Sequence, residues 1–304
     1  MKVLMTGGTG LIGRELGKAL VNAGHNVFLI SRGQKSALSK VTYPCQVIEA
    51  DLNRGPSHDP RLDSVEVVIH LAGENVGAGR WTVSRKENIY ASRVNLTKNL
   101  LISLNNNKAL KVSISAGAIG IYGNRENEIL NEESKAGTGF LAEVCSAWES
   151  AVREGQSVFP KARFVVLRAG VVMSSSDGAL GKMIQPFRWG VGGVLGNGRQ
   201  WLSWIHIQDL VKIYLWALEN SAAVGGINAV SPNPVTNREI TCVLASILEK
   251  WVGPTVPAFV LRALLGEMSS LILNSARVEP RRLLSAGFRF EFPEIEGALQ
   301  SCLR

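Results

Sequence analysis

Three features of the sequence predict an α/β fold built on a doubly wound parallel sheet. Short apolar runs bounded by turn residues recur through the first half of the chain, as expected of buried strands. Longer stretches with apolar side chains at helical spacing lie between them. A glycine-rich turn joins the first strand to the first helix, which is how a βαβ unit of the Rossmann type begins.

The predicted strands and helices alternate in order along the chain. The first strand, residues 2–6 (KVLMT), leads through the turn GGTGLIG into a helix that Gly24 ends. Further strands are predicted at residues 25–31, 45–52, 65–73, 111–116 and 162–173, and further helices at residues 87–107 and 140–155. These elements complete a six-stranded sheet.

The composition of the sequence changes after Met173. Gly, Ser, Asn and Pro become frequent in SSSDGALG, WGVGGVLGNGRQ and SPNPVTN. We therefore expect a sheet domain over residues 1–173 and a smaller C-terminal substrate lobe over residues 174–304, with further Rossmann elements interleaved in the lobe. Its last segment, 253–304, is predicted to contain helices, a short strand at FRFEF (residues 288–292) and a closing helix.

Composition and charge exclude several classes of protein. The chain has 304 residues, of which 46% are hydrophobic and 19% charged, so general disorder is excluded. The net charge of +8 would suit an anionic ligand, but the basic residues are dispersed and indicate no nucleic-acid surface. The four cysteines lie far apart without a C-x-x-C motif, so we predict no metal site, no disulfide framework and a reduced, cytoplasmic protein.

Neither a signal peptide nor a membrane segment is expected. The start MKVLMTGGTG has no apolar core and no cleavage site. The most apolar later stretch, VPAFVLRALLGEMSSLIL, contains Arg262 and Glu267, which a bilayer would not accommodate comfortably. We expect a small-molecule partner and no membrane partner, and the oligomeric state is not predicted.

The first turn has a pattern typical of dinucleotide binding. Gly7, Gly10 and Gly13 form G-x-x-G-x-x-G between a strand and a helix. Glycines permit a tight turn, close approach of the backbone to a pyrophosphate, and close packing of the helix on the sheet. The helix N-terminus, with Leu11 and Ile12, would face the phosphates. The alternative is a purely structural glycine turn.

The end of the second strand indicates which dinucleotide is bound. A carboxylate at this position would bind the ribose 2′-hydroxyl of NAD, but the chain has Ser31 and Arg32, with Lys35 close behind. A guanidinium matches a 2′-phosphate in charge and geometry, so the sequence predicts NADP(H). In the alternative, Arg32 stacks on adenine or is a solvated loop charge.

Other cofactor contacts are expected after the third and fourth strands. Asp51 and Leu52 are placed to meet the adenine edge. Three residues end the fourth strand over the cofactor, where small side chains permit close approach: Leu71, Ala72 and Gly73. His70, inside that strand, is interpreted as a packed core histidine rather than a catalyst.

The motifs TGGTGLIG, ADL, HLAG, SISAGAIGIYG, LRAGVV and WIHIQDL occur in the order found in extended short-chain dehydrogenases/reductases, which this chain resembles. With the tail PAFVLRALLGEM…PRRLLSAGFRFEFPEIEGAL it looks like the atypical "epimerase family" subgroup, which is nucleoside-diphosphate-sugar-epimerase-like and sometimes labelled as cell-division inhibitors. The resemblance covers nearly the whole chain. It implies an NADP(H)-binding domain over residues 1–173, a family-specific segment over residues 253–304, and a cofactor contact at Val172.

The acid/base pair of that family is missing. Extended enzymes use a Tyr-x-x-x-Lys on the helix after the fifth strand, where the lysine cation lowers the phenol pKa. Here the helix begins GFLAEVCSAWE. Aligning the tyrosine with Phe140 puts Val144 at the lysine position, and aligning it with Leu141 puts Cys145 there, so the pair exists in neither register.

Substitutes for this pair are the catalytic candidates. The usual serine position falls on Gly117, so Ser115, two residues earlier on the same strand face, is the candidate hydroxyl. Tyr122 and His206 are candidate proton donors, although Tyr122 also fits a structural aromatic of the turn after the strand.

Two further groups of residues bear on ligand binding. Arg93, in ASRVNLT, stands where family members often have an asparagine near the cofactor and could reach the diphosphate, an anionic substrate or only the surface. Gln200, Trp201, Trp204 and His206 could form a substrate wall or simply pack the two lobes together.

Two functions remain open from the sequence. The first is an NADP(H)-dependent oxidoreductase or epimerase-like enzyme with a nonstandard proton donor and an unknown substrate. The second is a non-catalytic NADP(H)-binding redox sensor or regulatory protein, which the loss of the tyrosine and lysine favours.

Overall fold

A parallel sheet of seven strands forms the centre of the molecule. The computed structural model describes residues 1–175 and 178–303. The strand order is β12-β7-β5-β4-β1-β2-β3, and every neighbouring pair is parallel. The strands are β1 (Lys2–Thr6), β2 (Asn26–Ser31), β3 (Gln46–Glu49), β4 (Val67–His70), β5 (Val112–Ala118), β7 (Arg163–Ala169) and β12 (Gly225–Ala229).

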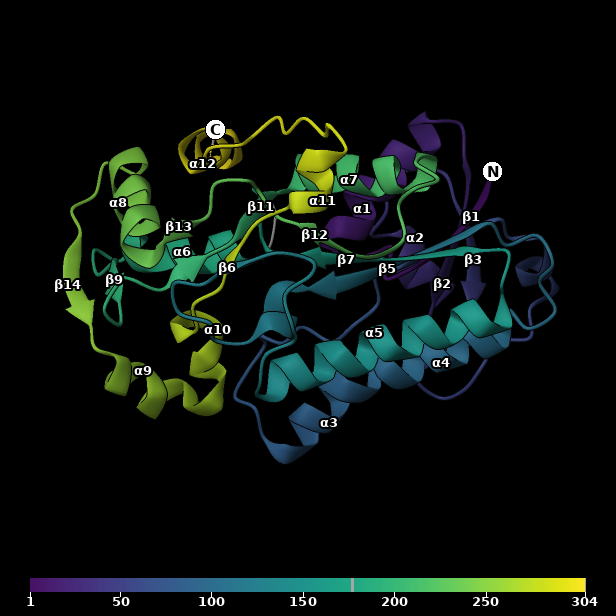
Figure 1. Ribbon diagram of the computed structural model, residues 1–304, viewed down its shortest axis with the longest axis horizontal. Coiled ribbons are helices and arrows are strands. Elements are labelled where there is room, and N and C mark those ends of the chain that lie inside the picture. The colour runs from purple at the N-terminus through teal and green to yellow at the C-terminus, as the bar shows by residue number, and fades with distance from the viewer. Residues whose placement is uncertain (176–177, 304) are drawn as a thin grey trace.

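Helices cover both faces of the sheet (Figure 1). On β1, Val3 and Met5 point into one hydrophobic cluster and Leu4 into the other, because successive side chains of a strand alternate between faces. The first cluster includes side chains of α1 (Leu11–Asn22) and α7 (Ile207–Glu219). The second includes side chains of α4 (Val94–Ser103) and α5 (Phe140–Val158), so the sheet lies between two helical layers.

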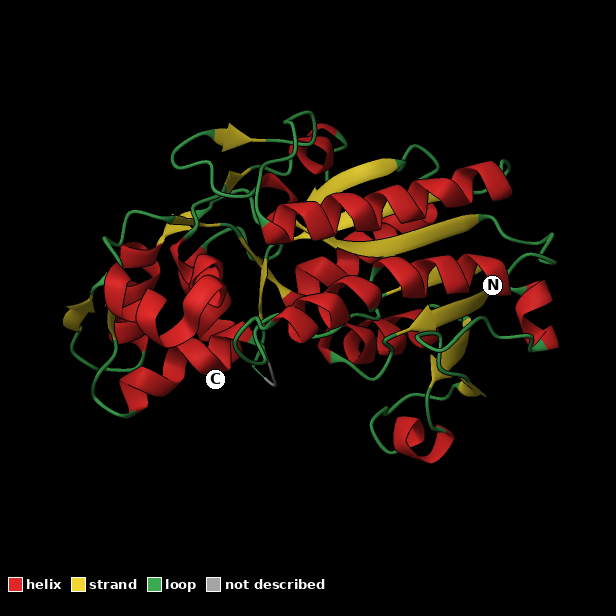
Figure 2. Ribbon diagram, turned by 90° about the horizontal axis from the view of Figure 1, so that it is seen from below, coloured by secondary structure: helices red, strands yellow, loops and turns green. Residues whose placement is uncertain are grey.

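The C-terminal lobe is a separate cluster of helices beside the sheet (Figure 2). Its interior is packed around Trp204, which is fully buried. The surrounding helices are α6 (Ala179–Arg188), α8 (Asn237–Ile247) and α12 (Ile295–Leu303). A two-stranded ladder of β9 (Gly193–Leu195) and β14 (Gly253–Val256) leads to α9 (Ala258–Leu265), η3 (Gly266–Ser269) and α10 (Ser270–Leu273).

Short elements connect these parts. They are α2 (Gln34–Leu38), η1 (Pro60–Ser64), η2 (Ile119–Tyr122), β6 (Ile129–Leu130), β10 (Trp201–Leu202), β11 (Trp204–His206), β13 (Val235–Thr236), β15 (Arg277–Val278) and α11 (Arg281–Ser285). None of the helices in the two described ranges combines the length and the apolar character needed to cross a bilayer.

The predicted fold class is confirmed, but the sheet has a seventh strand, β12, that was not predicted, and three of the predicted elements differ. The helix expected at residues 87–107 is two helices, α3 (Val83–Ala91) and α4, broken at Ser92 and Arg93. The strand expected at residues 162–173 divides at Gly170 into β7 and β8 (Val171–Met173), and β8 pairs with β11 outside the main sheet. A Cβ at Gly170 would lie 2.7 Å from the Ser203 carbonyl oxygen, so the chain bends where only glycine fits.

The third difference is the strand predicted at residues 288–292, which is wrong. Phe288 and Phe290 pack against the cluster that contains α7, but no strand forms there. Instead, the backbone N–H groups of Glu291 and Phe292 donate to the carboxylate of Asp209. A side chain thus satisfies donors that a strand would have given to a ladder.

The extent of the sheet domain differs from a simple division at Met173. β12 completes the sheet, and α7 packs on its α1 face, although both follow that residue. The boundary at residue 173 stays a prediction. Ser176 and Asp177, in the loop predicted after Met173, lie outside the described residues.

Candidate functional site

The glycine turn is packed directly on the end of β4. Gly7 has a φ of +69°, and a Cβ there would lie 2.7 Å from the backbone nitrogen of Ala72. A Cβ at Gly13 would lie 2.5 Å from the Gly7 carbonyl oxygen, which itself accepts a hydrogen bond from Gly10 N at 3.0 Å. Any side chain at Gly7 or Gly13 would therefore force the turn open. Leu11 and Ile12 begin α1 immediately beyond it.

The predicted adenosine end lies beside this turn. Thr6 pairs with Ile30 in the sheet, so Ser31 and Arg32 follow at the same edge as the glycines. Arg32 and Lys35 are exposed, and Arg32 makes no ion pair within the described chain. Its guanidinium is available to an anionic ligand.

Asp51 and Leu52 differ from each other in their surroundings. Asp51 is half-buried and pairs with Arg54 at 3.4 Å. Leu52 is only 3% exposed and packs in the cluster on the α4 and α5 face, so its side chain belongs to the core. Only the backbone of Leu52 remains at the edge, and its carbonyl oxygen accepts a hydrogen bond from Asn99.

His70 is a packed core histidine, as the sequence predicted. Its Nδ1 lies 2.6 Å from Thr6 Oγ1 and its Nε2 lies 3.0 Å from Thr97 Oγ1. Burial lowers the pKa of His70 to about 4, and the positive charge of Arg93 acts in the same direction. The imidazole is therefore neutral and connects β1, β4 and α4.

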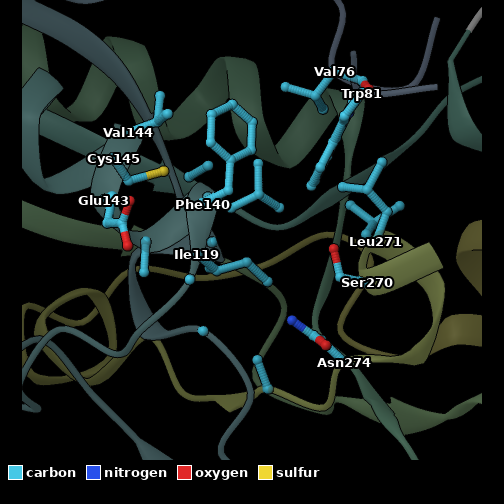
Figure 3. A pocket seen from close by; sticks show the side chains of 18 of the residues that line it. Val76, Trp81, Ile119, Phe140, Glu143, Val144, Cys145, Ser270, Leu271 and Asn274 are labelled. Atoms are coloured by element: carbon cyan, nitrogen blue, oxygen red, sulfur yellow. The ribbon is translucent and has the colours of Figure 1, made fainter. Parts of the chain in front are cut away.

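A cavity of about 1200 Å³ opens at the carboxyl ends of β4, β5 and β7. Leu71 and Gly73 line it after β4, and residues 116–120, at the end of β5 and the start of η2, form its floor. The start of α5 forms one wall, and the lobe segment containing η3 and α10 forms another. In Figure 3, Val144 and Cys145 lie on one side and Leu271 on the other. Parallel α/β sheets generally bind ligands at this edge.

The positions of the missing pair face this cavity. Phe140, Leu141, Val144 and Cys145 all line it, so neither register places a titrating tyrosine or lysine there. Burial raises the pKa of the Cys145 thiol to about 12. The charge of Arg93 opposes this shift but does not overcome burial, so the thiol stays protonated.

Arg93 reaches the same place from another element. It stands between α3 and α4 and lines the cavity, and a Cβ at Gly73 would lie 3.3 Å from its guanidinium carbon. It donates hydrogen bonds to the carbonyl oxygens of Glu74 at 2.9 Å and Ile89 at 3.2 Å. Burial lowers the pKa of Arg93 from its ordinary value. The guanidinium is therefore held by the backbone at the cavity wall.

The three catalytic candidates do not line the cavity. Ser115 is 1% exposed and donates to the Ala116 carbonyl oxygen. His206 caps α7, since its Nδ1 accepts a hydrogen bond from Gln208 N, and its ring packs on Phe292 with centroids 3.9 Å apart. Burial lowers the pKa of His206. The geometry supports a structural role for both residues.

Tyr122 is part of a buried polar network behind the cavity. Its hydroxyl lies 2.8 Å from Asn228 Oδ1 and accepts a hydrogen bond from Arg168 at 2.9 Å. Arg168 forms an ion pair with Glu149 of α5 at 2.7 Å. Burial raises the pKa of Tyr122. This network joins α5, β7 and β12, and the structural interpretation of Tyr122 fits it.

Of the expected substrate wall, only Trp201 lines the cavity. Trp204 is buried in the lobe, where its Nε1 donates to the Asn233 carbonyl oxygen. Gln200 donates to the Leu195 carbonyl oxygen. Val172 packs with the α1 and α7 cluster. Gly178 lies close to it and to Leu11, since a Cβ built at Gly178 would lie within 4.0 Å of the Val172 carbonyl oxygen and of the Leu11 side chain.

Several cavity residues had no signal specific enough to predict them. Trp81 and Phe140 form an edge-to-face pair with centroids 5.0 Å apart. Trp81 lies in a glycine-containing loop after β4, and an aromatic residue in such a loop is the one sequence clue. Leu271 comes from a segment more than a hundred residues away, and only the fold brings it to the cavity.

Comparison with known proteins places the chain in a family. Residues 3–230 match the NAD dependent epimerase/dehydratase family, and residues 256–302 match a domain of unknown function. Epimerase family protein YfhF of Bacillus subtilis is 36% identical over 308 residues, covering 100% of this chain and 98% of that protein.

Two further relatives agree with this. Epimerase family protein SDR39U1 homolog, chloroplastic, of Arabidopsis thaliana is 35% identical, covering 100% of this chain and 87% of that protein. A crystal structure of human epimerase family protein SDR39U1 with NADPH superposes with a TM-score of 0.87 at 31% identity, covering 100% of this chain and 99% of that chain. The chain therefore belongs to the NAD dependent epimerase/dehydratase family, the extended short-chain dehydrogenases/reductases.

Proposed function

We propose that the protein binds NADP(H) across the carboxyl edge of its sheet and is an oxidoreductase or epimerase-like enzyme acting on a carbonyl or alcohol group in the adjoining cavity. One observation carries the proposal. The glycine turn packs on Ala72, and the neighbouring residues Leu71 and Gly73 line the cavity. A dinucleotide whose pyrophosphate lies at the turn would thus extend its nicotinamide toward the cavity.

The residues present fit such a group. The turn has no Cβ at Gly7, Gly10 or Gly13, and α1 begins at its end, so the N-terminus of the helix lies at the turn. The human relative is described with NADPH, which supports the same cofactor here. The exposed guanidinium of Arg32 would pair with the 2′-phosphate.

When bound, the cofactor supplies hydride transfer at its nicotinamide ring. The protein's own residues then bind the pyrophosphate, orient the substrate and limit the entry of water. Since Phe140 or Leu141 stands where the proton-donating tyrosine would be, the proton for an alkoxide comes from water.

Substitution of Arg32 by alanine tests the cofactor assignment. One charge-assisted pair at a partly exposed site contributes roughly 1.5 to 3 kcal/mol, so Arg32→Ala should weaken NADPH binding about tenfold or more and leave NADH binding nearly unchanged. Nicotinamide fluorescence measures both affinities. Lys40→Ala, at another exposed cation after α2, is the matched control and should change neither. Equal losses of affinity for NADPH and NADH would contradict the assignment of Arg32 to the 2′-phosphate.

A non-catalytic NADP(H)-binding redox sensor is the second candidate. The observation that favours it is that Ser115, Tyr122 and His206 all lie outside the cavity lining. Turnover with a panel of carbonyl compounds, followed by nicotinamide absorbance, separates the two functions. We also propose a cytoplasmic location, because all four cysteines are free thiols.

A further inference from the structure

We propose that the cavity takes an apolar, ring-bearing carbonyl compound and not a sugar nucleotide. This inference rests on the proposed function, since it names the substrate class of the same site. It follows from which side chains line the cavity, how they are used elsewhere in the fold, and which charges are available there.

The cavity walls carry apolar side chains that do not pack in the hydrophobic core. Val76, Trp81, Phe140, Leu141 and Leu271 line the cavity, yet none belongs to the four hydrophobic clusters that build the interior of the described chain. Figure 3 shows Val76, Trp81, Phe140 and Leu271 around the same space. Apolar side chains that face a cavity without packing a core are an apolar ligand surface.

The aromatic pair adds a preference for rings. Trp81 and Phe140 meet edge to face at an interplanar angle of 63°. The Trp81 indole N–H donates to the Val76 carbonyl oxygen at 2.8 Å, which fixes the orientation of the ring. A planar ligand could pack beside this pair in the offset or edge-to-face geometry that aromatic rings favour.

The cations of the cavity do not suit a diphosphate. Lys86 is paired with Glu267 and lies 5.3 Å from the centre of the Phe140 ring. Arg93 is held by backbone carbonyl oxygens. Among the described lining residues, Arg262 is the one arginine or lysine whose side chain makes no ion pair or hydrogen bond, and it is exposed. A nucleoside diphosphate needs several charge-assisted donors, and one exposed arginine does not provide them.

The reaction that follows is reduction of a ketone or aldehyde to an alcohol. A hydride from the reduced nicotinamide bonds to the carbonyl carbon as the π bond breaks, and the oxygen takes a proton from water. The cavity volume of about 1200 Å³ exceeds the usual range for small-molecule pockets, so a nicotinamide and a two-ring substrate fit together.

Calorimetry with two probes tests the proposal without turnover. We would titrate 2-acetylnaphthalene and UDP-glucose into the protein, each with and without saturating NADP⁺, which cannot reduce either probe. The naphthyl ketone should bind at least tenfold more tightly than UDP-glucose. Tighter binding of UDP-glucose would overturn the inference.

A pair of leucine variants from one segment provides the matched control. Leu271→Asp puts a charge on the cavity wall, whereas Leu264→Asp makes the same change at a side chain that is 65% exposed and outside the lining. Leu271→Asp should weaken ketone binding about tenfold or more, and Leu264→Asp should leave it within twofold. Val76→Asp, on a different wall, should repeat the loss. Equal effects of the two leucine variants would contradict the assignment.

The same titrations separate the two proposals. Thermal unfolding of every variant should match the parent protein, and each variant should still bind NADP⁺, because none of these positions touches the glycine turn that would hold the pyrophosphate. If the parent protein does not bind NADP⁺, the proposed function is refuted. Ketone binding that depends on Leu271 would, in that case, still support the inferred chemistry of the cavity. Normal NADP⁺ binding without ketone binding would refute the substrate class alone.

Discussion

The guanidinium carbon of Arg93 lies 5.3 Å from the centre of the Trp148 ring. Trp148 is a buried residue of α5, and its ring also meets His70 edge on. Arg93 thereby joins α5 to the loop after β4, where it donates to the carbonyl oxygen of Glu74. Arg93 therefore places a cation from outside α5 near the position of the family's lysine. Its packing on Trp148 holds it there.

Arg93→Ala should destabilise the protein. It removes hydrogen bonds from a charged donor and a desolvated cation–π contact, so we expect a loss of about 2 to 4 kcal/mol in the free energy of unfolding. Urea denaturation measures this loss. Arg153→Ala, at an exposed arginine of α5, should change the same quantity by less than about 0.5 kcal/mol. Similar values for both variants would show that Arg93 is not held as described.

Alanine at two glycines of the first turn should separate folding from binding. Gly10 has a φ of −79°, and a Cβ there meets only the Gly7 carbonyl oxygen, at 3.3 Å. Gly10→Ala should therefore fold normally and lose most of its NADPH affinity. At Gly13 the Cβ would lie 2.5 Å from two backbone atoms, so Gly13→Ala should also lower the unfolding free energy by about 1 to 3 kcal/mol. Circular dichroism and cofactor titration check both outcomes, and undiminished NADPH affinity in Gly10→Ala would place the ligand elsewhere.

Cys145 should be chemically inert. With a pKa of about 12, its thiol is almost wholly protonated at pH 8, and the thiolate is the reactive form. Iodoacetamide should modify the exposed Cys242 long before Cys145, as mass mapping of peptides would show. Any reductase activity should change less than about threefold in Cys145→Ser, because a catalytic acid would contribute about 10² or more. A hundredfold loss with unchanged NADPH affinity would instead identify Cys145 as a proton donor.

His70 should make stability depend on pH. Its folded-state pKa of about 4 lies below the ordinary value of 6.5 in the unfolded chain, so between these values the unfolded state binds a proton that the folded state does not. The contribution of His70 is complete above about pH 6.5 and is lost toward pH 4, by up to about 1.4 kcal/mol per pH unit. Urea denaturation from pH 4.5 to 7.5 should give a shallower dependence for His70→Gln, although that variant is less stable throughout. The exposed His58→Gln should keep the slope of the parent protein.

The sequence was sufficient to predict the sheet and the cofactor end, because both depend on local patterns. Strand β1, the glycines and the start of α1 are contiguous, so their spacing alone indicates the turn. The core role of His70 was predictable from its place inside an apolar strand. Strand β12 was missed, since its GGINA sequence has little β propensity and its place at the sheet edge depends on pairing with β7.

The catalytic candidates could not be judged from sequence in the same way. Tyr122 and His206 are residue types that carry chemistry, but their hydrogen bonds to Asn228 and Gln208 are visible only after folding. The prediction of a strand at residues 288–292 was wrong because a carboxylate distant in sequence, Asp209, accepts hydrogen bonds from the backbone N–H groups that a strand would have used. Alternation of apolar residues cannot reveal such a competitor.

The residues that line the cavity come from both matched parts of the chain. Its floor and the wall from α5 come from the part of the chain that matches the epimerase model, whereas Leu271 and Arg262 come from the part that matches the second domain. The second part touches the first through the Lys86–Glu267 ion pair and through Arg80, which donates to the Ala263 carbonyl oxygen. Substitutions after residue 256 can therefore change what enters the cavity without touching the glycine turn, so relatives could diverge in substrate while conserving their coenzyme.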